Sequence, residues 1–203
     1  MILFVNACVR PQSGTKRLAQ SVLRKLGGDV KEVDLEREKV SPLNGTMLER
    51  RLRVISAGAF DDPMFDLAKD FAAAEKIVIA APYWDLSFPA LLKCYIEQIS
   101  VIGLTFAYDD TGRPYGLCKA DRLIYVTTSG GPMFNEDAGF GAISNHWLKI
   151  FTAYEMFPAS KPKILIWSAP MPKAFYRWRK SNSLYDLSAF LKRADDNEFG
   201  VVF

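Results

Sequence analysis

The sequence predicts an α/β fold in which five parallel strands form one doubly wound sheet with helices on both faces. Short uncharged runs of β-branched and aromatic residues recur along the chain, as is typical of strands buried on both faces. Segments with helical periodicity lie between these runs. The chain has 203 residues, 49% of them hydrophobic, and no linker rich in Pro, Gly or Ser. It is therefore expected to form a single domain over residues 1–203.

The strands are expected at four apolar runs and one more polar segment. The apolar runs are residues 2–5, 77–81, 123–127 and 164–167. Residues 30–35 are predicted to form the remaining strand. Lys31, Glu32 and Asp34 in this segment suit a strand at the edge of a sheet, where charged side chains can reach water.

Helices are predicted between these strands. Apolar residues recur every four positions in the segment 18–26, and Gly27 follows them as a typical helix end. Pro89 begins a second helix with its apolar residues on one side. The other expected helices are one or two within residues 47–74, one at residues 140–157 and one at residues 183–194.

Strands that alternate with helices and cross over in the right-handed sense form a doubly wound sheet. The dinucleotide-binding strand order and the flavodoxin-type order 2-1-3-4-5 are both common, and five strands favour the second. A hairpin insertion is predicted near residues 104–117, with its turn at residues 109–112. Ligands of such sheets bind at the carboxyl ends of the strands, so the loops that follow the strands hold the candidate site.

Composition and charge exclude several classes of function. The chain has 26 Lys and Arg against 23 Asp and Glu, with the two signs interspersed, so no nucleic-acid partner is expected. One histidine and three separated cysteines leave too few ligands for a zinc site, and no metal is expected. No run approaches the roughly 20 apolar residues of a membrane helix, and residues 2–5 lack a basic leader. We therefore expect a soluble, cytoplasmic protein without membrane insertion.

The loop after the first strand has the composition of a phosphate site. Ser13 and Thr15 place hydroxyls at the start of a helix, and Arg10 and Lys16 add positive charge. Backbone N–H groups and the helix dipole attract anions at such a position. The alternative is an ordinary helix N-cap at Ser13 or Thr15. The loop matches neither the nucleoside-triphosphate P-loop nor the dinucleotide-binding glycine motif.

The loop after the third strand combines aromatic side chains with backbone amides. It contains Pro82, Tyr83, Trp84, Asp85 and Leu86. A flat isoalloxazine ring, apolar on its faces and hydrogen-bonding along one edge, suits such a loop. The alternative is that the two aromatic rings pack beneath the loop.

The fourth strand ends in Thr128, Ser129, Gly130 and Gly131. Consecutive glycines let the backbone approach a ligand closely. Their N–H groups can bond the pyrimidine edge of a flavin, where negative charge develops on reduction. A plain turn is the alternative.

In this set and order, the motifs resemble those of the flavodoxin-like NAD(P)H:quinone oxidoreductase and FMN-dependent NADH-azoreductase family. The likeness covers residues 1–157. It implies a homodimeric enzyme that binds FMN non-covalently at the subunit interface. Two electrons would pass from NADH or NADPH through the flavin to a small-molecule electron acceptor, such as a quinone, an azo compound or a similar aromatic, in a ping-pong reaction. The flavin would carry the chemistry, so no residue is assigned as a catalytic acid or base.

The resemblance also implies a role for each loop. Ser13 and Thr15 would hold the phosphate, with Arg10 and Lys16 as charge partners. Residues 82–86 would line the flavin ring, and residues 128–131 would bind its pyrimidine edge. In similar proteins the hairpin overhangs the active site, so Phe106 and Tyr108 are candidates for contact with the flavin or the acceptor. Packing within the hairpin is their alternative role.

The sequence departs from the family at several positions. Cys8 stands where serine is usual, and we expect a packed side chain there rather than an exposed thiol. Asp85 stands where asparagine is common. A carboxylate beside the flavin would lower its reduction potential, unless the side chain points away. Met133 and Phe134 stand where many relatives have a histidine.

The basic aromatic stretch at residues 173–180 is unlike the usual family tail. We interpret it as a solvated helix face, with an anion or nucleotide contact as the alternative. Two other functions remain open for the chain as a whole. One is a flavodoxin-type electron carrier, which its net charge of +3 disfavours. The other is a non-catalytic FMN-binding sensor module.

Overall fold

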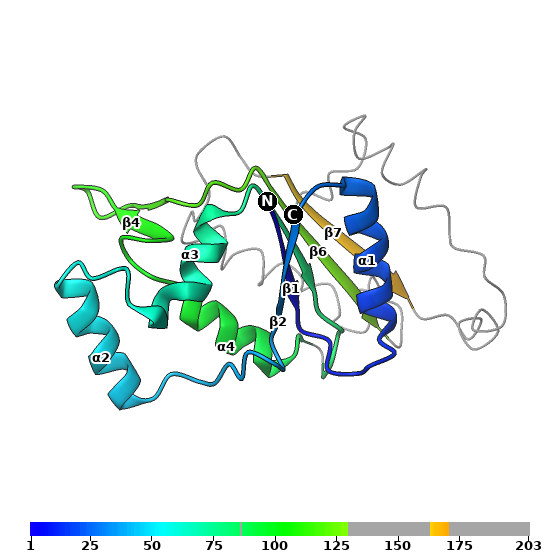
Figure 1. Ribbon diagram of the computed structural model, residues 1–203, viewed down its shortest axis with the longest axis horizontal. Helices are drawn as coiled ribbons and strands as arrows, with labels where there is room; N and C mark the ends of the chain where they lie inside the picture. Colours follow the sequence, from blue (N-terminus) through cyan, green and yellow to red (C-terminus); the bar gives the residue numbers. More distant parts are fainter. Residues whose placement is uncertain (86, 130–162, 171–203) are drawn as a thin grey trace, which may run out of the picture.

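The computed structural model describes residues 1–85, 87–129 and 163–170 of the chain. Its main sheet has five parallel strands in the order β2-β1-β3-β6-β7 (Figure 1). Numbered within this sheet alone, the order is 2-1-3-4-5, so the predicted flavodoxin-type topology is confirmed. The strands are β1 (Ile2–Asn6), β2 (Val30–Asp34), β3 (Lys76–Ala80), β6 (Arg122–Ser129) and β7 (Lys163–Pro170).

The helices of the described chain follow the predicted pattern. They are α1 (Gly14–Leu26), α2 (Gly45–Ser56), the 3-10 helix η1 (Pro63–Phe65), α3 (Asp66–Ala73) and α4 (Ala90–Ile99). The segment predicted to hold one or two helices therefore has two α-helices, separated by η1. Gly27 ends α1 with φ of +63°, a conformation in which a Cβ would be strained. The helices predicted at residues 140–157 and 183–194 lie outside the described residues.

The central strands β1 and β3 are buried on both faces, as their apolar runs predict. Ile2 and Phe4 of β1 pack in a cluster with Ala19 and Val22 of α1. Leu3, the residue between them, packs on the opposite face, with side chains of α3 and α4. Successive side chains of a strand point to opposite faces, so α1 covers one face and α3 and α4 cover the other.

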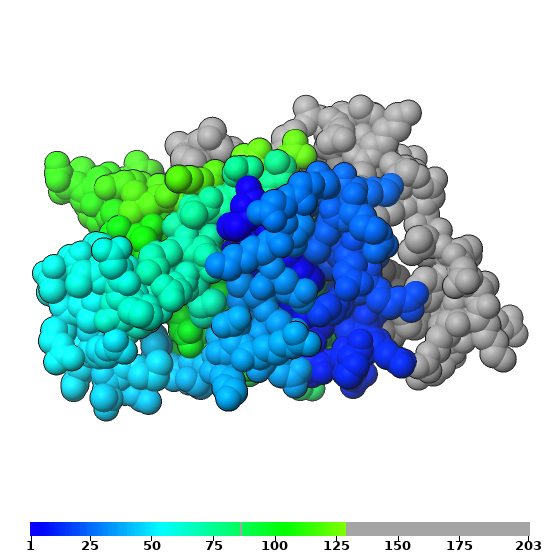
Figure 2. All heavy atoms as spheres, viewed as in Figure 1, coloured from blue at the N-terminus to red at the C-terminus, as the bar shows by residue number. Residues whose placement is uncertain are grey.

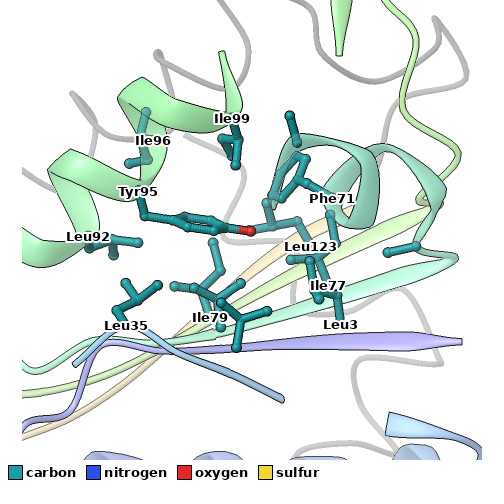
Figure 3. Packing of buried hydrophobic residues seen from close by; sticks show 14 of the residues in the cluster. Leu3, Leu35, Phe71, Ile77, Ile79, Leu92, Tyr95, Ile96, Ile99 and Leu123 are labelled. Carbon is teal, nitrogen blue, oxygen red and sulfur yellow. The ribbon is translucent and has the colours of Figure 1, made fainter. Parts of the chain in front are cut away.

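Tyr95 anchors α4 on the sheet. Its side chain is fully buried and lies over the strands among Ile79, Leu92 and Phe71 (Figure 3). The rings of Tyr95 and Phe71 meet edge to face at 6.4 Å between centroids. Burial raises the pKa of the Tyr95 hydroxyl well above its ordinary value. This packing holds α4, the helix that follows the loop after β3, against the sheet.

The predicted hairpin is present between α4 and β6. Its antiparallel strands are β4 (Phe106–Tyr108) and β5 (Pro114–Gly116). Asp109 and Gly112 close the predicted turn, with the Gly112 N–H donating to the Asp109 carbonyl at 2.9 Å.

The hairpin leaves the sheet at the amino ends of its strands. The Thr105 hydroxyl donates to the carbonyl of Ile99, the last residue of α4, at 2.7 Å. The Lys119 N–H donates to the carbonyl of Ala72, near the end of α3, at 2.9 Å. The carboxyl end of α3 leads into β3, and that of α4 leads through the hairpin into β6, so both helix ends lie beside the amino ends of the strands. The hairpin and α2 accordingly form the end of the molecule away from α1 (Figures 1 and 2).

A buried arginine holds α2 against α4. Nη1 of Arg51 donates to the carbonyl of Glu97 at 2.7 Å, and its Nη2 donates to the carbonyl of Ser100. The Arg51 residue is 8% exposed, and burial lowers the pKa of its guanidinium. These bonds satisfy carbonyls that the end of a helix leaves without intrahelical partners. Within the described part of the chain, no helix is long and apolar enough to cross a membrane.

Candidate functional site

The three loops singled out by the sequence meet at the carboxyl ends of β1, β3 and β6. The hydroxyl oxygens of Thr15 and Thr128 are 2.6 Å apart. The carbonyl of Thr128 accepts a hydrogen bond from the Tyr83 N–H at 3.0 Å. The Ala7 N–H donates to the carbonyl of Ala80 at 2.9 Å. Thr128 therefore contacts both of the other loops, and the three form one continuous surface.

The first loop ends in a capped helix. Ser13 has extended backbone angles, and its Oγ accepts a hydrogen bond from the Lys16 N–H at 3.3 Å. The Ser13 N–H donates to the carbonyl of Arg10 at 3.1 Å and closes a turn. Ser13 is thus the N-cap of α1, the role that the sequence leaves open for it as the alternative to a phosphate site. This role is compatible with an anion site, because the first N–H groups of a helix have no intrahelical acceptors.

The two cations of the first loop are placed differently. Arg10 is exposed. Lys16 turns towards β2, where its Nζ lies 2.8 Å from Oε1 of Glu32 and 3.9 Å from Oδ2 of Asp34. Lys16 is predicted to be a charge partner of a phosphate. A phosphate would have to compete for its ammonium group with two carboxylates that already lie beside it.

Cys8 is a packed side chain, as expected. The residue is 7% exposed, and its Sγ lies 3.6 Å from the carbonyl oxygen of Ala80. Burial raises the pKa of the Cys8 thiol, and the neighbouring Ser13 hydroxyl and Lys16 charge oppose part of that rise. The thiol is therefore held mainly in its protonated form.

The loop after β3 contains a tight turn. The Trp84 N–H donates to the Ser87 carbonyl at 2.9 Å, and the Ser87 N–H donates back to the Trp84 carbonyl at 2.7 Å. Asp85, within this turn, is exposed and has φ of +46°, a left-handed conformation that Asp and Asn adopt more readily than most residues. Pro82, Tyr83 and Trp84 are half-buried. Leu86 lies outside the described residues.

The last strand-end loop is described only in part. Thr127 is buried and Thr128 is half-buried. Ser129 is the last residue of β6. The other residues singled out in the C-terminal part of the sequence lie outside the described residues; these are Gly130, Gly131, Met133, Phe134 and residues 173–180.

The aromatic residues of the hairpin lie away from these loops in the same chain. Phe106 is 4% exposed and belongs to the core, and its ring meets that of Tyr108 edge to face at 5.7 Å. Within its own chain, Phe106 therefore packs in the core and against Tyr108, which is the alternative to its candidate role as a contact of the flavin or the acceptor. Tyr108 is 48% exposed. Because the hairpin leaves the sheet at its amino end, the structure does not bring either residue to the strand-end loops of its own chain.

Three polar residues beside the first loop were not singled out by sequence reasoning. Asn6 is 1% exposed, and it hydrogen-bonds Glu32 and Asp34 of the neighbouring strand. The sequence signal for Asn6 is an amide at the end of an otherwise apolar strand. For Glu32 and Asp34 the sequence indicates only charges suited to an edge strand.

Fold and site together define a class of protein. It is a doubly wound α/β protein whose open edge offers a helix N-terminus, paired hydroxyls and half-buried aromatic rings, a combination that suits a flat ligand carrying a phosphate. The chain belongs to the family described as having a flavodoxin-like fold, whose model matches residues 1–179.

Several curated proteins are similar to the chain in sequence. The chain is 34% identical over 137 residues to FMN-dependent NADH:quinone oxidoreductase 2 of Clostridium acetobutylicum, covering 64% of this chain and 68% of the relative. It is 32% identical over 148 residues to the FMN-dependent NADH:quinone oxidoreductase of Ruminiclostridium cellulolyticum, covering 64% and 69%. The match to the Clostridium perfringens (strain SM101) enzyme of that name spans about half of each chain, 54% of both, at 35% identity.

Solved structures share the fold at lower sequence identity. An azoreductase from Bacillus anthracis superposes with a TM-score of 0.72 at 19% identity, covering 98% of this chain and 99% of the other. An FMN-dependent NADH-azoreductase from Bacillus anthracis, in complex with FMN, gives a TM-score of 0.66 at 20% identity, covering 83% and 86%.

Proposed function

We propose that the protein is an FMN-dependent NAD(P)H oxidoreductase that reduces quinones, azo compounds or similar aromatic acceptors. The family and the names of the curated relatives support this proposal. The observation that carries it is the position of Thr128, whose hydroxyl contacts Thr15 and whose carbonyl contacts the Tyr83 N–H. One residue thereby joins the loops proposed for the phosphate, the ring and the pyrimidine edge.

The described residues fit FMN chemically. The N-terminus of α1, capped by Ser13, supplies N–H groups and a dipole for the phosphate. The bond between the Thr15 and Thr128 hydroxyls uses one of their two hydrogens, which leaves the other for a ligand oxygen. Tyr83 and Trp84 are half-buried, as suits side chains that pack against a flat ring.

The chain's residues would bind and orient the cofactor. When bound, FMN supplies the redox chemistry, accepting a hydride from NADH or NADPH and passing two electrons to the acceptor. Ser13, Thr15 and Arg10 would hold the phosphate end. Pro82, Tyr83 and Trp84 would pack against the ring and exclude water from it. Thr128 and the backbone after it would bind the polar edge.

We also propose that the enzyme is a cytoplasmic homodimer with its site at the subunit interface. The hairpin leaves the sheet at its amino end, so within one chain it cannot overhang the strand-end loops. Its exposed apolar side chains include Tyr108 at 48%, Tyr115 at 45% and Leu117 at 38%, and a second copy would bury them. All three cysteines are free and buried, which suits a reducing compartment.

The proposal is tested with purified protein. Reconstitution with FMN should give a bound flavin with its characteristic visible absorption bands. Anaerobic addition of NADH or NADPH should bleach those bands, and a quinone or an azo dye should restore them. Failure to bind FMN would contradict the proposal, and so would bound flavin that neither nicotinamide reduces.

The same experiment separates the alternatives. A flavodoxin-type carrier would bind FMN but react poorly with NADH and NADPH alone. A sensor module would bind FMN without turnover of quinone acceptors. Sedimentation analysis of the FMN-loaded protein tests the dimer, and a monomer that turns over at full rate would contradict the interface site.

A further inference from the structure

Both ends of the first loop are tied to the same pair of carboxylates on β2. Nδ2 of Asn6 donates to Oε1 of Glu32 at 3.1 Å and to Oδ2 of Asp34 at 3.2 Å. Nζ of Lys16 lies 2.8 Å from the same Glu32 oxygen and 3.9 Å from the same Asp34 oxygen. Asn6 ends β1 directly before the loop, and Lys16 lies in the first turn of α1 directly after it. The carboxylate pair therefore bridges the two sides of loop 7–13.

The Asn6 side chain is held in a single orientation. Its Oδ1 accepts a hydrogen bond from the Cys8 N–H at 3.1 Å, while its Nδ2 faces the two carboxylates. An amide offers an acceptor on one side and donors on the other, and at 1% exposure this one has little access to water. An aspartate at this position would bring a third carboxylate against the other two. The first peptide groups of the loop are thus fixed through Asn6.

The charge of this cluster does not favour a phosphate. Glu32 and Asp34 carry two negative charges, and Lys16 supplies one positive charge against them. The exposed guanidinium of Arg37, whose Nε lies 3.9 Å from Oδ2 of Asp34, adds a second positive charge. These four groups together carry no net charge, so Coulomb's law predicts that the cluster as a whole does not attract a dianion bound in the loop. If the cluster helps to bind a phosphate, it does so through the shape that it gives the loop.

We propose that Asn6, Lys16, Glu32 and Asp34 are positioning residues that set the shape of loop 7–13 before the phosphate of FMN binds. The inference rests on the proposed function for its ligand. A loop held in its bound conformation loses less freedom on binding, and so binds more tightly. Lys16 acts through Glu32 and is not a ligand of the phosphate.

Flavin titration of the full-length, flavin-free protein tests the proposal, with FMN compared against riboflavin, which lacks the phosphate. Glu32→Ala should weaken FMN binding about three- to tenfold, the range expected for losing a partly exposed ion pair together with a charge-assisted hydrogen bond. Riboflavin affinity should stay unchanged. Lys16→Met should give the same loss, and the double variant should lose no more than either single variant. Lys16→Arg should retain most of the affinity.

A matched control lies on the same strand. Nζ of Lys31 forms an ion pair with Oδ2 of Asp70 at 2.6 Å, remote from the loop. Lys31→Met removes a similar pair and should leave the FMN dissociation constant unchanged. If Glu32 acts by charge, Glu32→Ala will tighten FMN binding, which overturns the proposal. If Lys16 is a phosphate ligand, the losses from Lys16→Met and Glu32→Ala will add, which also overturns it.

Amide hydrogen exchange separates this inference from the proposed function. In flavin-free protein, Glu32→Ala should speed exchange in residues 7–16, and Lys31→Met should not. Unchanged exchange in that segment overturns the inference even if the wild-type protein binds FMN. If the wild type binds neither FMN nor riboflavin, the proposed function fails, while the exchange rates still decide whether the carboxylates shape the loop.

Discussion

The hydroxyl oxygens of Thr15 and Thr128 lie 2.6 Å apart, although 113 positions separate the two residues in the sequence. Thr15 belongs to the first turn of α1, and Thr128 lies near the end of β6. Parallel strands bring their carboxyl ends to one edge of a sheet, and this contact shows how closely two of the loops approach there. Two motifs that are each weak in the sequence thus become parts of one surface.

Removing either hydroxyl of this pair should weaken FMN binding. Thr128→Val keeps the shape of the side chain but leaves the Thr15 hydroxyl without this partner, so we expect roughly a tenfold rise in the FMN dissociation constant. Thr15→Val should behave similarly, and a double-mutant cycle should show coupling of about 1 kcal/mol. Thr46→Val on the exposed surface of α2 is the control. Unchanged affinity in Thr128→Val would exclude this role for the hydroxyl pair.

The sheet could be predicted from the sequence because its signals are local. The run 2–5 is uncharged and β1 is buried along its whole length, and its alternate residues pack on opposite faces. The hairpin was also predictable, since an Asp-rich turn ending in Gly112 separates its two strands. In both cases, neighbouring residues alone decide the local structure.

The polar contacts around the site could not be predicted in the same way. The position of Lys16 beside the first loop predicts a charge partner for a phosphate. However, β2 pairs with β1 in a register that places Asp34 opposite Asn6 and brings Glu32 within reach of Lys16. Such pairings depend on strand register and on side-chain direction. The position of Tyr108 likewise depends on which end of the sheet the hairpin leaves, which local patterns do not specify.

Asp85 is predicted to carry backbone strain within the turn after β3. Its φ of +46° lies in the left-handed region, where asparagine and glycine are tolerated and a branched side chain costs about 1 kcal/mol or more. Asp85→Val should therefore lower the free energy of unfolding by at least that amount, whereas Asp85→Asn and Asp85→Gly should not. Urea denaturation measures these changes. Asp61→Val, at an exposed position without positive φ, is the control, and an equal loss in it would contradict the strain.

The turn of the hairpin should lose stability in acid through Asp109. Hydrogen bonds from the Thr111 hydroxyl and from the backbone N–H groups of Arg113 and Thr111 lower the pKa of the Asp109 carboxyl below its ordinary value of 3.8. A lowered pKa in the folded state gives stability that is present above pH 3.8 and is lost as the pH falls through the folded-state pKa.

Asp109→Ala should therefore remove part of the acid dependence of unfolding below about pH 4. The measurement is the pH profile of the free energy of unfolding for both proteins. NMR titration of the Asp109 carboxyl gives the pKa directly. An ordinary pKa in that titration would contradict the hydrogen-bonding pattern of the turn.

The cysteines are expected to be inert in the folded protein. Cys8, Cys94 and Cys118 are all buried, and burial raises the pKa of the Cys118 thiol to about 12. The thiolate is the reactive form, so a disulfide-exchange reagent at pH 8 should modify the native protein slowly and modify all three thiols quickly in urea. One thiol reacting in the native state as quickly as it does in urea would contradict this expectation, and mass spectrometry would identify it.

Arg51 is predicted to be a major contributor to the attachment of α2. Its guanidinium donates to the carbonyls of Glu97 and Ser100, and the residue is 8% exposed. Arg51→Met keeps much of the apolar stem but leaves both carbonyls without this donor, so we expect a loss of about 2 kcal/mol in the free energy of unfolding.

Arg51→Lys offers a single ammonium group in place of the planar guanidinium, which can donate to two carbonyls at once, and should recover only part of that loss. Arg53→Met, at an exposed position of the same helix, should cost less than about 0.5 kcal/mol. Urea denaturation of the three variants measures the difference, and equal losses in Arg51→Met and Arg53→Met would show that the two carbonyls gain nothing from the guanidinium.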